Sequence, residues 1–383
     1  MPTALRRQPP ACRKRWGALL AALALCLLLL APWLRLLLPR PLFQRRAMAL
    51  PGVPLTPFTE AYLASLPPAD YASPLAAQRE AREAAEAAVR ARDGRLPMHE
   101  VRDVPPAGAR PLLRVFTPPA APDGSGGAAP TAAARPSIRY AHGGGWVLSS
   151  VATHDQLCRR MARAAGAVVV SVEYRLAPEH AYPAALDDFA EGYAWAAGAA
   201  GARGVVLAGD SAGGNLAAGL ALRLRDEAAA APGAAAAALP PLPLAMLLIY
   251  PALDSRCALP SYAKFAEGYG LTRAGMRHFW AAYLGGAERL ASAPPYASPL
   301  QAGSLAGLPP ALVAVAAADV LHDEGVAFYD RLVAAGGRAE LTVAVGQVHG
   351  FIKRAGNPEG DAFVEDVVQR AVALAMGGAR GAV

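Results

Sequence analysis

The chain has 383 residues, of which 54% are hydrophobic and 17% are charged, and it carries a formal net charge of +7. It is long enough to bury a large core, either as two or three domains or as one α/β domain with a cap. The positive charge is confined to the N-terminus: nine basic and no acidic residues precede Ala47, which leaves 28 basic and 30 acidic residues, a net −2, after it. A globular part so close to neutral excludes nucleic acid as the expected partner.

Residues 17–34 form an uncharged apolar segment of 18 residues, about the minimum length of a membrane-spanning helix. A cleavable signal peptide is the alternative, but Arg35 and Pro39 separate this segment from its only small-residue cleavage site, at 47–49. We therefore expect residues 1–46 to be a basic tail with an uncleaved anchor, in a single-pass membrane protein. Five basic residues precede the segment and four lie on or after it, which slightly favours placing the rest of the chain on the non-cytoplasmic side.

The four cysteines have no paired spacing, no Cys-x-x-Cys motif and no histidine at metal-ligand spacing. These features predict neither a disulfide framework nor a zinc site. We expect no metal and no cofactor, and nothing in the sequence indicates the oligomeric state.

After the apolar segment, residues 47–70 are rich in proline and are predicted to form a stalk. Residues 73–92 are rich in Ala, Glu and Arg, with opposite charges at helical spacing, and predict a helix. A short strand is expected at 111–118. A low-complexity loop of Gly, Pro and Ala follows at 119–136.

Beyond residue 136, apolar runs alternate with helix patterns, which predicts an α/β fold with a mostly parallel sheet and crossover helices on both faces. The expected strands are 137–141, 167–172, 204–208, 244–250, 311–317 and 341–345. The expected helices are 154–165, 184–200 and 212–230. Residues 257–286 interrupt the alternation with an aromatic helical insertion, expected over the carboxyl ends of the strands, where open α/β sheets bind their ligands.

Three glycines follow the first of these strands, in the tract Tyr-Ala-His-Gly-Gly-Gly-Trp. Backbone N–H groups in such a tract can converge on one point without obstruction from side chains. In acyl transfer they stabilise the oxyanion of the tetrahedral intermediate, together with the N–H of the residue after the nucleophile. We expect Gly143, Gly144 and Ala212 to form this oxyanion hole.

The tract Gly-Asp-Ser-Ala-Gly at 209–213 joins a strand pattern to a helix pattern and is typical of a nucleophile elbow. Its glycines permit a turn so tight that Ser211 stands above the sheet at a helix N-terminus, where developing negative charge is favoured. The alternative is a glycine-rich turn with a capping serine. The glycine tract upstream favours the nucleophile.

A serine hydroxyl becomes nucleophilic when a base takes its proton and an acid orients that base. In a fold with this elbow the chain order is nucleophile, acid, histidine. His349 follows the last expected strand and is favoured over His322, which begins a helix pattern. Asp319 ends the penultimate strand and is the expected acid, while Asp254, at the equivalent place one strand earlier, is the alternative.

Together with the glycine tract and the elbow, three further tracts resemble the hormone-sensitive lipase family of α/β-hydrolases, over about residues 100–375. These tracts are Val-Glu-Tyr-Arg-Leu-Ala-Pro-Glu-His, Ala-Asp-Val-Leu-His-Asp-Glu and Val-His-Gly-Phe. The resemblance implies carboxylesterase or lipase activity, a helical cap, and Ser211, Asp319 and His349 as the catalytic triad. The N-terminal anchor is similar to that of the arylacetamide deacetylase branch.

The resemblance and the composition together divide the chain into three parts. Residues 1–46 are the tail and anchor, and residues 47–110 are the stalk and N-terminal cap helices. Residues 111–383 are the α/β-hydrolase catalytic domain, with a cap insertion at about 257–286.

The expected function is that of a serine carboxylic ester hydrolase, which cleaves apolar short- to medium-chain acyl or aryl esters through an acyl-enzyme. An apolar substrate is favoured by the membrane anchor and by the aromatic residues of the insertion, although any of these can instead pack the core of the cap. These residues are Tyr262, Phe265, Tyr269, Phe279, Trp280 and Tyr283. The alternatives are an amide deacetylase, a receptor-like non-catalytic protein on the same fold, and a tethered interaction protein. The presence of His349 favours an enzyme.

Overall fold

The computed structural model of the chain describes residues 53–66, 73–108, 111–119, 136–199, 205–231, 239–354 and 356–377. Its internal contacts divide the chain into two units, Met1–Phe43 and Gln44–Val383, and all described residues belong to the second. The expected anchor at 17–34 therefore lies outside the described residues. Among the helices that are described, none is long and apolar enough to cross a membrane.

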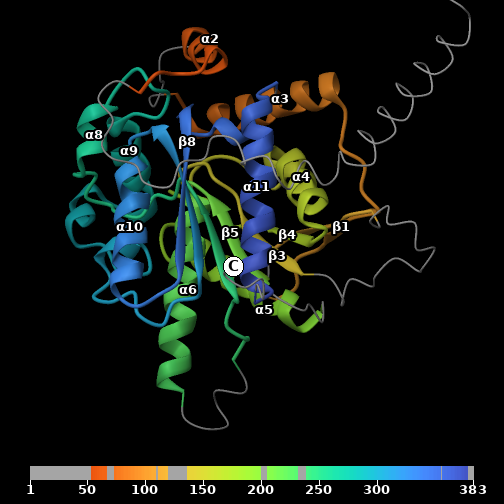
Figure 1. Cartoon of the computed structure of the whole chain (residues 1–383), viewed down its shortest axis with the longest axis vertical. Coiled ribbons are helices and arrows are strands. Elements are labelled where there is room, and N and C mark those ends of the chain that lie inside the picture. Colours follow the sequence, from red (N-terminus) through yellow and green to blue (C-terminus); the bar gives the residue numbers. More distant parts are fainter. Residues whose placement is uncertain are drawn as a thin grey trace, which may run out of the picture. The chain divides into compact units, whose positions relative to one another are not determined.

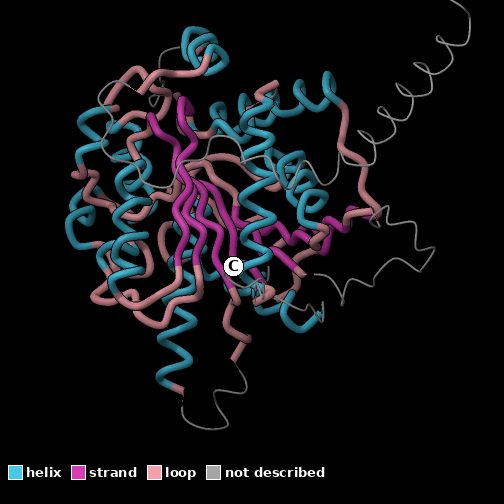
Figure 2. The backbone as a smooth tube through the Cα atoms, viewed as in Figure 1, coloured by secondary structure: helices cyan, strands magenta, loops and turns pink. Residues whose placement is uncertain are grey.

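The centre of the fold is an eight-stranded sheet in the order β1-β2-β4-β3-β5-β6-β7-β8, drawn in magenta in Figure 2. The strands are β1 (Glu100–Val104), β2 (Leu113–Thr117), β3 (Ser137–Ala141), β4 (Val168–Val172), β5 (Val205–Asp210), β6 (Ala245–Ile249), β7 (Ala311–Ala318) and β8 (Ala339–Val348). β1 pairs with β2 and β2 with β4 in antiparallel register, while all other neighbours are parallel. Every residue of β3 to β7 is buried, as expected for strands covered on both faces.

Helices cover both faces of this sheet, so the expected α/β fold is confirmed (Figure 1). They are α2 (Pro57–Ser65), α3 (Leu75–Asp93), α4 (Asp155–Ala165), α5 (Ala184–Ala199), α6 (Ala212–Ala230), α8 (Pro260–Lys264), α9 (Arg273–Leu284), α10 (His322–Ala334) and α11 (Pro358–Ala375). α4 and α11 pack against one face, where Met161 and Val367 join the core beneath Ile138. α5, α6 and α10 contribute to the core of the other face, around Leu207 and Val313.

The sequence did not predict α2, β1 or α11. Within the stretch expected to be a stalk, α2 begins at Pro57 because proline is well tolerated in the first turn of a helix, and the Thr56 hydroxyl caps it by accepting from Thr59 N at 3.2 Å. The Thr56 N–H also donates to Gly346 O at 3.2 Å, which attaches this segment to β8. β1 is an exposed edge strand that pairs only with β2, so it has no apolar run that marks it.

The aromatic insertion contains α8 and α9 and packs against the glycine tract. The ring of Trp146, the residue after that tract, stacks on Tyr283 with a centroid distance of 4.3 Å and an interplanar angle of 4°. The Trp280 ring lies 4.3 Å from Trp146. All three of these side chains are fully buried, so Trp280 and Tyr283 belong to a core that the insertion shares with the segment after the glycine tract.

Candidate active site

Ser211 sits at the turn between β5 and α6 in a backbone conformation that few residues adopt. Its φ is 57° and its ψ is −119°, and its N–H donates to Ile249 O at 2.8 Å. The glycines around it are required sterically: a Cβ at Gly209 would lie 2.2 Å from Gly213 C, and one at Gly213 would lie 1.9 Å from Ala141 O. This strained, tightly packed turn is the geometry of a nucleophile elbow.

A continuous chain of hydrogen bonds links Ser211 to a histidine and a carboxylate. Ser211 Oγ lies 3.0 Å from His349 Nε2, and His349 Nδ1 lies 2.7 Å from Asp319 Oδ2. Asp319 is only 1% exposed, and its other oxygen accepts from Leu321 N at 3.0 Å, so the carboxylate is fixed in place. These distances are within the range needed for proton transfer from the serine to the imidazole.

The alternative acid and base occupy other places. The buried carboxylate of Asp254 pairs with Arg256 at 2.8 Å. His322 Nδ1 lies 2.8 Å from Ala316 O at the start of α10. Within the described part of the chain, neither residue forms a hydrogen bond with Ser211 or His349.

The glycine tract differs from the expectation at its first residue. The Gly143 N–H donates to Asp210 Oδ1 at 2.7 Å, so this N–H is occupied by the protein and does not point freely to a substrate. Gly144 carries a φ of 130° and turns the chain, with Leu148 N donating to its carbonyl at 2.9 Å. Ala212 is the first residue of α6, and an N–H group in the first turn of a helix has no helical carbonyl to which it can donate. Gly144 and Ala212 thus remain as candidate oxyanion donors, and Gly143 is corrected to a supporting role.

Asp210, the residue before the serine, is the centre of a buried polar cluster. Its Oδ1 accepts from the Tyr140 hydroxyl at 2.5 Å and lies 3.4 Å from His154 Nε2. Burial raises the pKa of the Asp210 carboxyl, but the nearby His154, Lys353 and Tyr140 groups oppose it and hold the pKa far below its usual range. Asp210 is therefore an anion that holds the first residue of the glycine tract against the elbow.

His142, the residue before the three glycines, is an uncharged part of this cluster. Burial, reinforced by the neighbouring His154, lowers the pKa of His142 to about 3. The Tyr174 hydroxyl donates to His142 O at 2.7 Å, and the two rings stack with a centroid distance of 4.2 Å. His142 thus fixes the start of the tract by packing and hydrogen bonding rather than by charge.

The sequence did not indicate the contacts that hold the loop of the histidine. Arg354 Nη2 donates to His349 O at 3.1 Å, and the Arg354 guanidinium lies 3.2 Å over the Tyr62 ring of α2. Gln347, two residues before the histidine, accepts from the Thr59 hydroxyl of α2 at 3.3 Å. These contacts could not be predicted because Thr59 and Tyr62 lie in the stretch that was predicted to be a stalk.

Within the described residues, no group of three or more His, Cys, Asp or Glu side chains is placed to hold a metal ion. The two described cysteines, Cys158 and Cys257, are buried and free. The hydrogen-bonded serine, histidine and carboxylate supply the groups that acyl transfer requires. An elbow serine in this arrangement, on a mostly parallel sheet, defines the class of α/β-hydrolase folds.

Comparison with known proteins agrees with this class. Residues 138–353 match the family described as alpha/beta hydrolase fold. The chain is 40% identical over 226 residues to the carboxylic ester hydrolase LipN of Mycobacterium tuberculosis, covering 57% of this chain and 58% of that protein. It is 39% identical over 249 residues to the esterase LipI of the same organism, covering 63% of this chain and 71% of the relative.

A solved structure is similar over a larger share of the chain. The esterase of Pyrobaculum calidifontis matches with a TM-score of 0.72 and 32% identity, covering 84% of this chain and 100% of that one. The chain belongs to the α/β-hydrolase family, in the hormone-sensitive lipase-like group that its sequence tracts resemble. The expected hydrolase class is thereby confirmed, since these relatives are ester hydrolases.

Proposed function

We propose that this protein is a serine carboxylic ester hydrolase that acts through an acyl-enzyme intermediate. The observation that carries the proposal is the unbroken chain from Ser211 Oγ through His349 to Asp319, with distances of 3.0 and 2.7 Å. The names of the relatives, which are ester hydrolases and esterases, support the same reaction.

In the first half of the reaction His349 Nε2 takes the proton of Ser211 while Oγ attacks the ester carbonyl carbon. The bond between that carbon and the alcohol oxygen then breaks, and His349 returns the proton to the departing alcohol. Water enters, loses a proton to His349 and attacks the acyl carbon, and Ser211 is released with its proton as the carboxylic acid leaves. Asp319 accepts from Nδ1–H throughout, which fixes the tautomer and stabilises the imidazolium.

The oxyanion formed in each half of the reaction needs preorganised donors. The N–H groups of Gly144 and Ala212 fill this role in the proposal, because Asp210 already occupies the Gly143 N–H. Asp210 then acts as a positioning residue, since it fixes the tract that contains Gly144 to the elbow that contains Ala212.

The proposed substrates are apolar esters with short or medium acyl chains, or aryl esters. The ring of Phe279 supports this, because it lies directly against the glycine tract: a Cβ on Gly145 would be 2.5 Å from it. Such a ring places hydrocarbon beside the reacting ester and excludes water as the oxyanion forms. The relative named ethyl acetate hydrolase in Pseudomonas putida, 36% identical, is in keeping with a small ester.

We further propose that residues 17–34 anchor the protein in a membrane as a single span, with the catalytic part on the non-cytoplasmic side. The support is the uncharged length of that segment and the basic residues that precede it. Full-length protein should then stay with membranes during carbonate extraction. Release of the intact chain, or an N-terminus near Ala49 found by sequencing, would contradict the anchor.

The test of the reaction uses the full-length protein. A fluorophosphonate probe should label wild-type protein at Ser211, and p-nitrophenyl butanoate should be hydrolysed. Ser211→Ala should abolish both while near-UV circular dichroism is retained, since loss of a triad member typically costs several powers of ten in rate. Hydrolysis by this variant above about a tenth of the wild-type rate would rule out the serine as nucleophile. Absence of both labelling and hydrolysis in wild-type protein would favour the receptor-like alternative, and hydrolysis of aryl amides in preference to esters would favour the deacetylase.

A further inference from the structure

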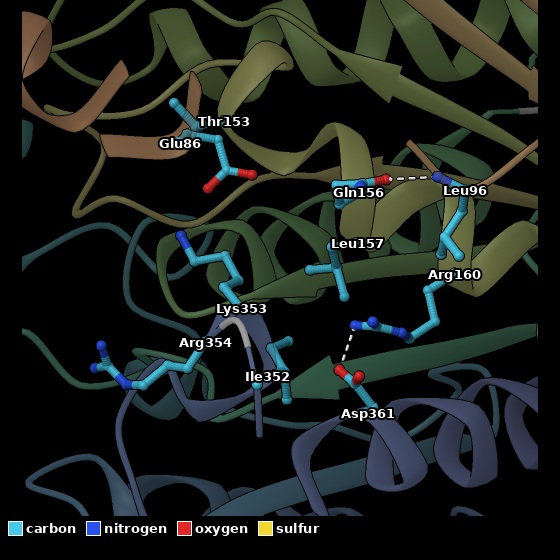
Figure 3. Close-up of a pocket in the computed structure, with 11 residues that line it drawn as sticks. Glu86, Leu96, Thr153, Gln156, Leu157, Arg160, Ile352, Lys353, Arg354 and Asp361 are labelled. Carbon is cyan, nitrogen blue, oxygen red and sulfur yellow. Dashed lines mark hydrogen bonds and ion pairs between the residues drawn. The ribbon is translucent and has the colours of Figure 1, made fainter. Parts of the chain in front are cut away.

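The structure contains a cavity of about 240 Å³ whose lining does not include Ser211 or His349. It lies between α3, α4, α11 and the short helix η5 (Phe351–Lys353), which follows the loop of His349. The side chains used in the argument below are Glu86, Leu157, Arg160, Ile352, Lys353 and Asp361, all drawn in Figure 3. A liquid water occupies about 30 Å³, so the cavity has room for a small organic molecule.

The Lys353 ammonium group points into this cavity without a direct partner. It forms no ion pair within 4.0 Å and no hydrogen bond with any residue in the described part of the chain, and no dashed line reaches it in Figure 3. Burial lowers the pKa of Lys353 to about 8, although the carboxylate of Asp210 favours its charged form. The Lys353 side chain is half-buried, so its ammonium group keeps only part of its hydration, and no described carboxylate lies within ion-pair distance of it. A ligand that supplies a negative charge would be its direct partner there.

The neighbouring charges do not neutralise Lys353. Arg160 and Asp361 pair with each other at 2.5 Å across the cavity wall. Two anions, Asp210 and Glu86, and two cations, Arg82 and Arg354, act on Lys353 from a greater distance. The charged side chains that line the cavity carry three positive and two negative charges, a net charge of +1; they are Glu86, Arg160, Lys353, Arg354 and Asp361. A monoanion matches this charge, whereas a dianion such as phosphate would also face the Glu86 and Asp361 carboxylates.

The remaining lining is partly apolar. The side chains of Leu157 and Ile352 face the cavity beside the polar groups, as Figure 3 shows. Both belong to the core between the sheet and the α4 and α11 helices and are buried, so this wall is preformed. A ligand that fits has a single carboxylate and a short hydrocarbon chain.

We propose that this cavity binds a short-chain carboxylate, with its carboxylate group on Lys353 Nζ and its hydrocarbon against Leu157 and Ile352. Lys353 lies four residues after His349 on the same connection, which places the site directly beside the loop of the histidine. If the proposed esterase function holds, this ligand class is that of the acid product. The site then binds what the reaction releases, at a place separate from Ser211.

The test uses full-length protein whose serine is blocked with a fluorophosphonate, so that product cannot bind at Ser211. The chain has three lysines, Lys14, Lys264 and Lys353, and their acetylation by sulfosuccinimidyl acetate at pH 8 can be followed separately by peptide mass spectrometry. Sodium butanoate should slow acetylation of Lys353 in a saturable way at millimolar concentration, because a bound anion holds the ammonium in its protonated form. Lys264, which is exposed on α8, should react at an unchanged rate and is the internal control.

Calorimetric titration with butanoate gives an independent measurement. Lys353→Met keeps the aliphatic stem and should weaken binding at least 10-fold, Lys353→Arg should retain most of it, and Lys264→Met should leave it unchanged. Three results would overturn the proposal: no protection of Lys353 in wild-type protein, equal protection of Lys353 and Lys264, or protection by inorganic phosphate as strong as that by butanoate. If the serine does not react with the fluorophosphonate, the proposed function is contradicted. The same binding measurements, made on Ser211→Ala, then still test whether the cavity binds a carboxylate.

Discussion

The side chain of Asp210 and the backbone of Gly143 are joined by a hydrogen bond of 2.7 Å. This bond connects the residue before the elbow serine to the first glycine of the tract that carries the candidate oxyanion donor. The two sides of the site come from the ends of neighbouring parallel strands, β3 and β5, and the bond fixes their separation. The close contact leaves no space for a side chain at Gly143, where a Cβ would lie 2.5 Å from Asp210 Oδ2.

The first prediction is that Asp210 positions the glycine tract. Asp210→Ala should lower kcat by about 10- to 100-fold with little change in KM, a loss somewhat below the cost of removing an oxyanion donor outright. Asp210→Asn, whose amide oxygen can still accept from Gly143 N–H, should recover part of the loss. Tyr140→Phe removes another partner of the same carboxylate and is the control. Equal losses of kcat in Tyr140→Phe and Asp210→Ala would mean that kcat depends on the whole polar cluster and not on the hydrogen bond to Gly143 in particular.

The second prediction assigns the acid of the triad. Asp319→Asn should reduce kcat by about 10⁴-fold, because an amide in this position favours the wrong tautomer of His349. Asp254→Asn should cost less than about 10-fold, since it loses only an ion pair to a half-exposed Arg256. Steady-state kinetics of both variants on one ester decide the matter. A larger loss of kcat in Asp254→Asn than in Asp319→Asn would identify Asp254 as the acid of the triad.

The third prediction concerns the turn at Gly144. A Cβ there would lie 2.1 Å from Leu148 O, so Gly144→Ala must move the tract. We expect a loss of kcat of about 10²- to 10³-fold, the usual cost of a misplaced oxyanion donor. Gly166→Ala is a matched control, because Gly166 also has a positive φ, of 59°, but no atom lies within 4 Å of its Cβ. That variant should lose about 1 kcal/mol of stability and keep its activity. Unimpaired kcat in Gly144→Ala would exclude this N–H as a donor.

The fourth prediction is a pH dependence of stability due to Glu324. This carboxyl is fully buried and accepts from Leu253 N, from Asp254 N and from the Tyr262 hydroxyl at 2.7 Å. Burial raises its pKa to about 8, against these hydrogen bonds, which lower it. The folded chain therefore keeps this proton between about pH 4.5 and 8 while the unfolded chain releases it. Over that window the contribution of Glu324 to the free energy of unfolding falls as pH rises, by up to about 1.4 kcal/mol per unit.

Glu324→Gln removes the titration, so its stability should decline less between pH 5 and pH 7.5 than that of the wild-type protein. Thermal unfolding of the full-length proteins in one detergent buffer measures both, and contributions of other groups cancel in the comparison. Identical pH profiles would mean that the three donors keep Glu324 ionised throughout.

The fifth prediction concerns the acyl chain. With an apolar ring beside the tract, kcat/KM should rise from acetyl to butanoyl or hexanoyl p-nitrophenyl esters, by about 10-fold or less for each added methylene. Phe279→Ala should flatten this rise, while Tyr269→Ala, on the other part of the insertion, should preserve it. A flat or falling series in the wild-type protein, or a preference for anionic esters, would contradict an apolar acyl site.

Most of the sheet could be predicted from the sequence because buried parallel strands are continuous apolar runs. β3 has the bounds that the pattern predicts, β6 is one residue shorter at each end than predicted, and β7 is one residue longer at its C-terminal end. β1 was missed because an exposed edge strand owes its conformation to its neighbour rather than to its own residues. α2 was missed because prolines were taken to break the chain, although Pro57 stands at a position where it favours a helix.

The candidate site was predictable in its residues but not in its geometry. The order of Ser211, Asp319 and His349 along the chain could be read from strand ends and glycines. The hydrogen bond between Asp210 and Gly143 could not be predicted from the sequence, because it depends on the side-chain orientation of Asp210. One useful signal was present and unused: Arg256, two residues after Asp254, offers that carboxylate a partner and argues against its role as the acid.

The hydrogen bond from Thr59 of α2 to Gln347 at the end of β8 spans 288 residues of sequence. Translation produces α2 early and its partner strand β8 nearly last. The helix therefore lacks its hydrogen bond to β8 until almost the whole protein has been synthesised. The serine, the acid and the histidine are likewise synthesised in that order, and the histidine arrives on the same late segment. A growing chain on the ribosome therefore contains a nucleophile without its base. On the proposed mechanism such a chain lacks general-base catalysis, so we expect esterase activity only after β8 has joined the sheet.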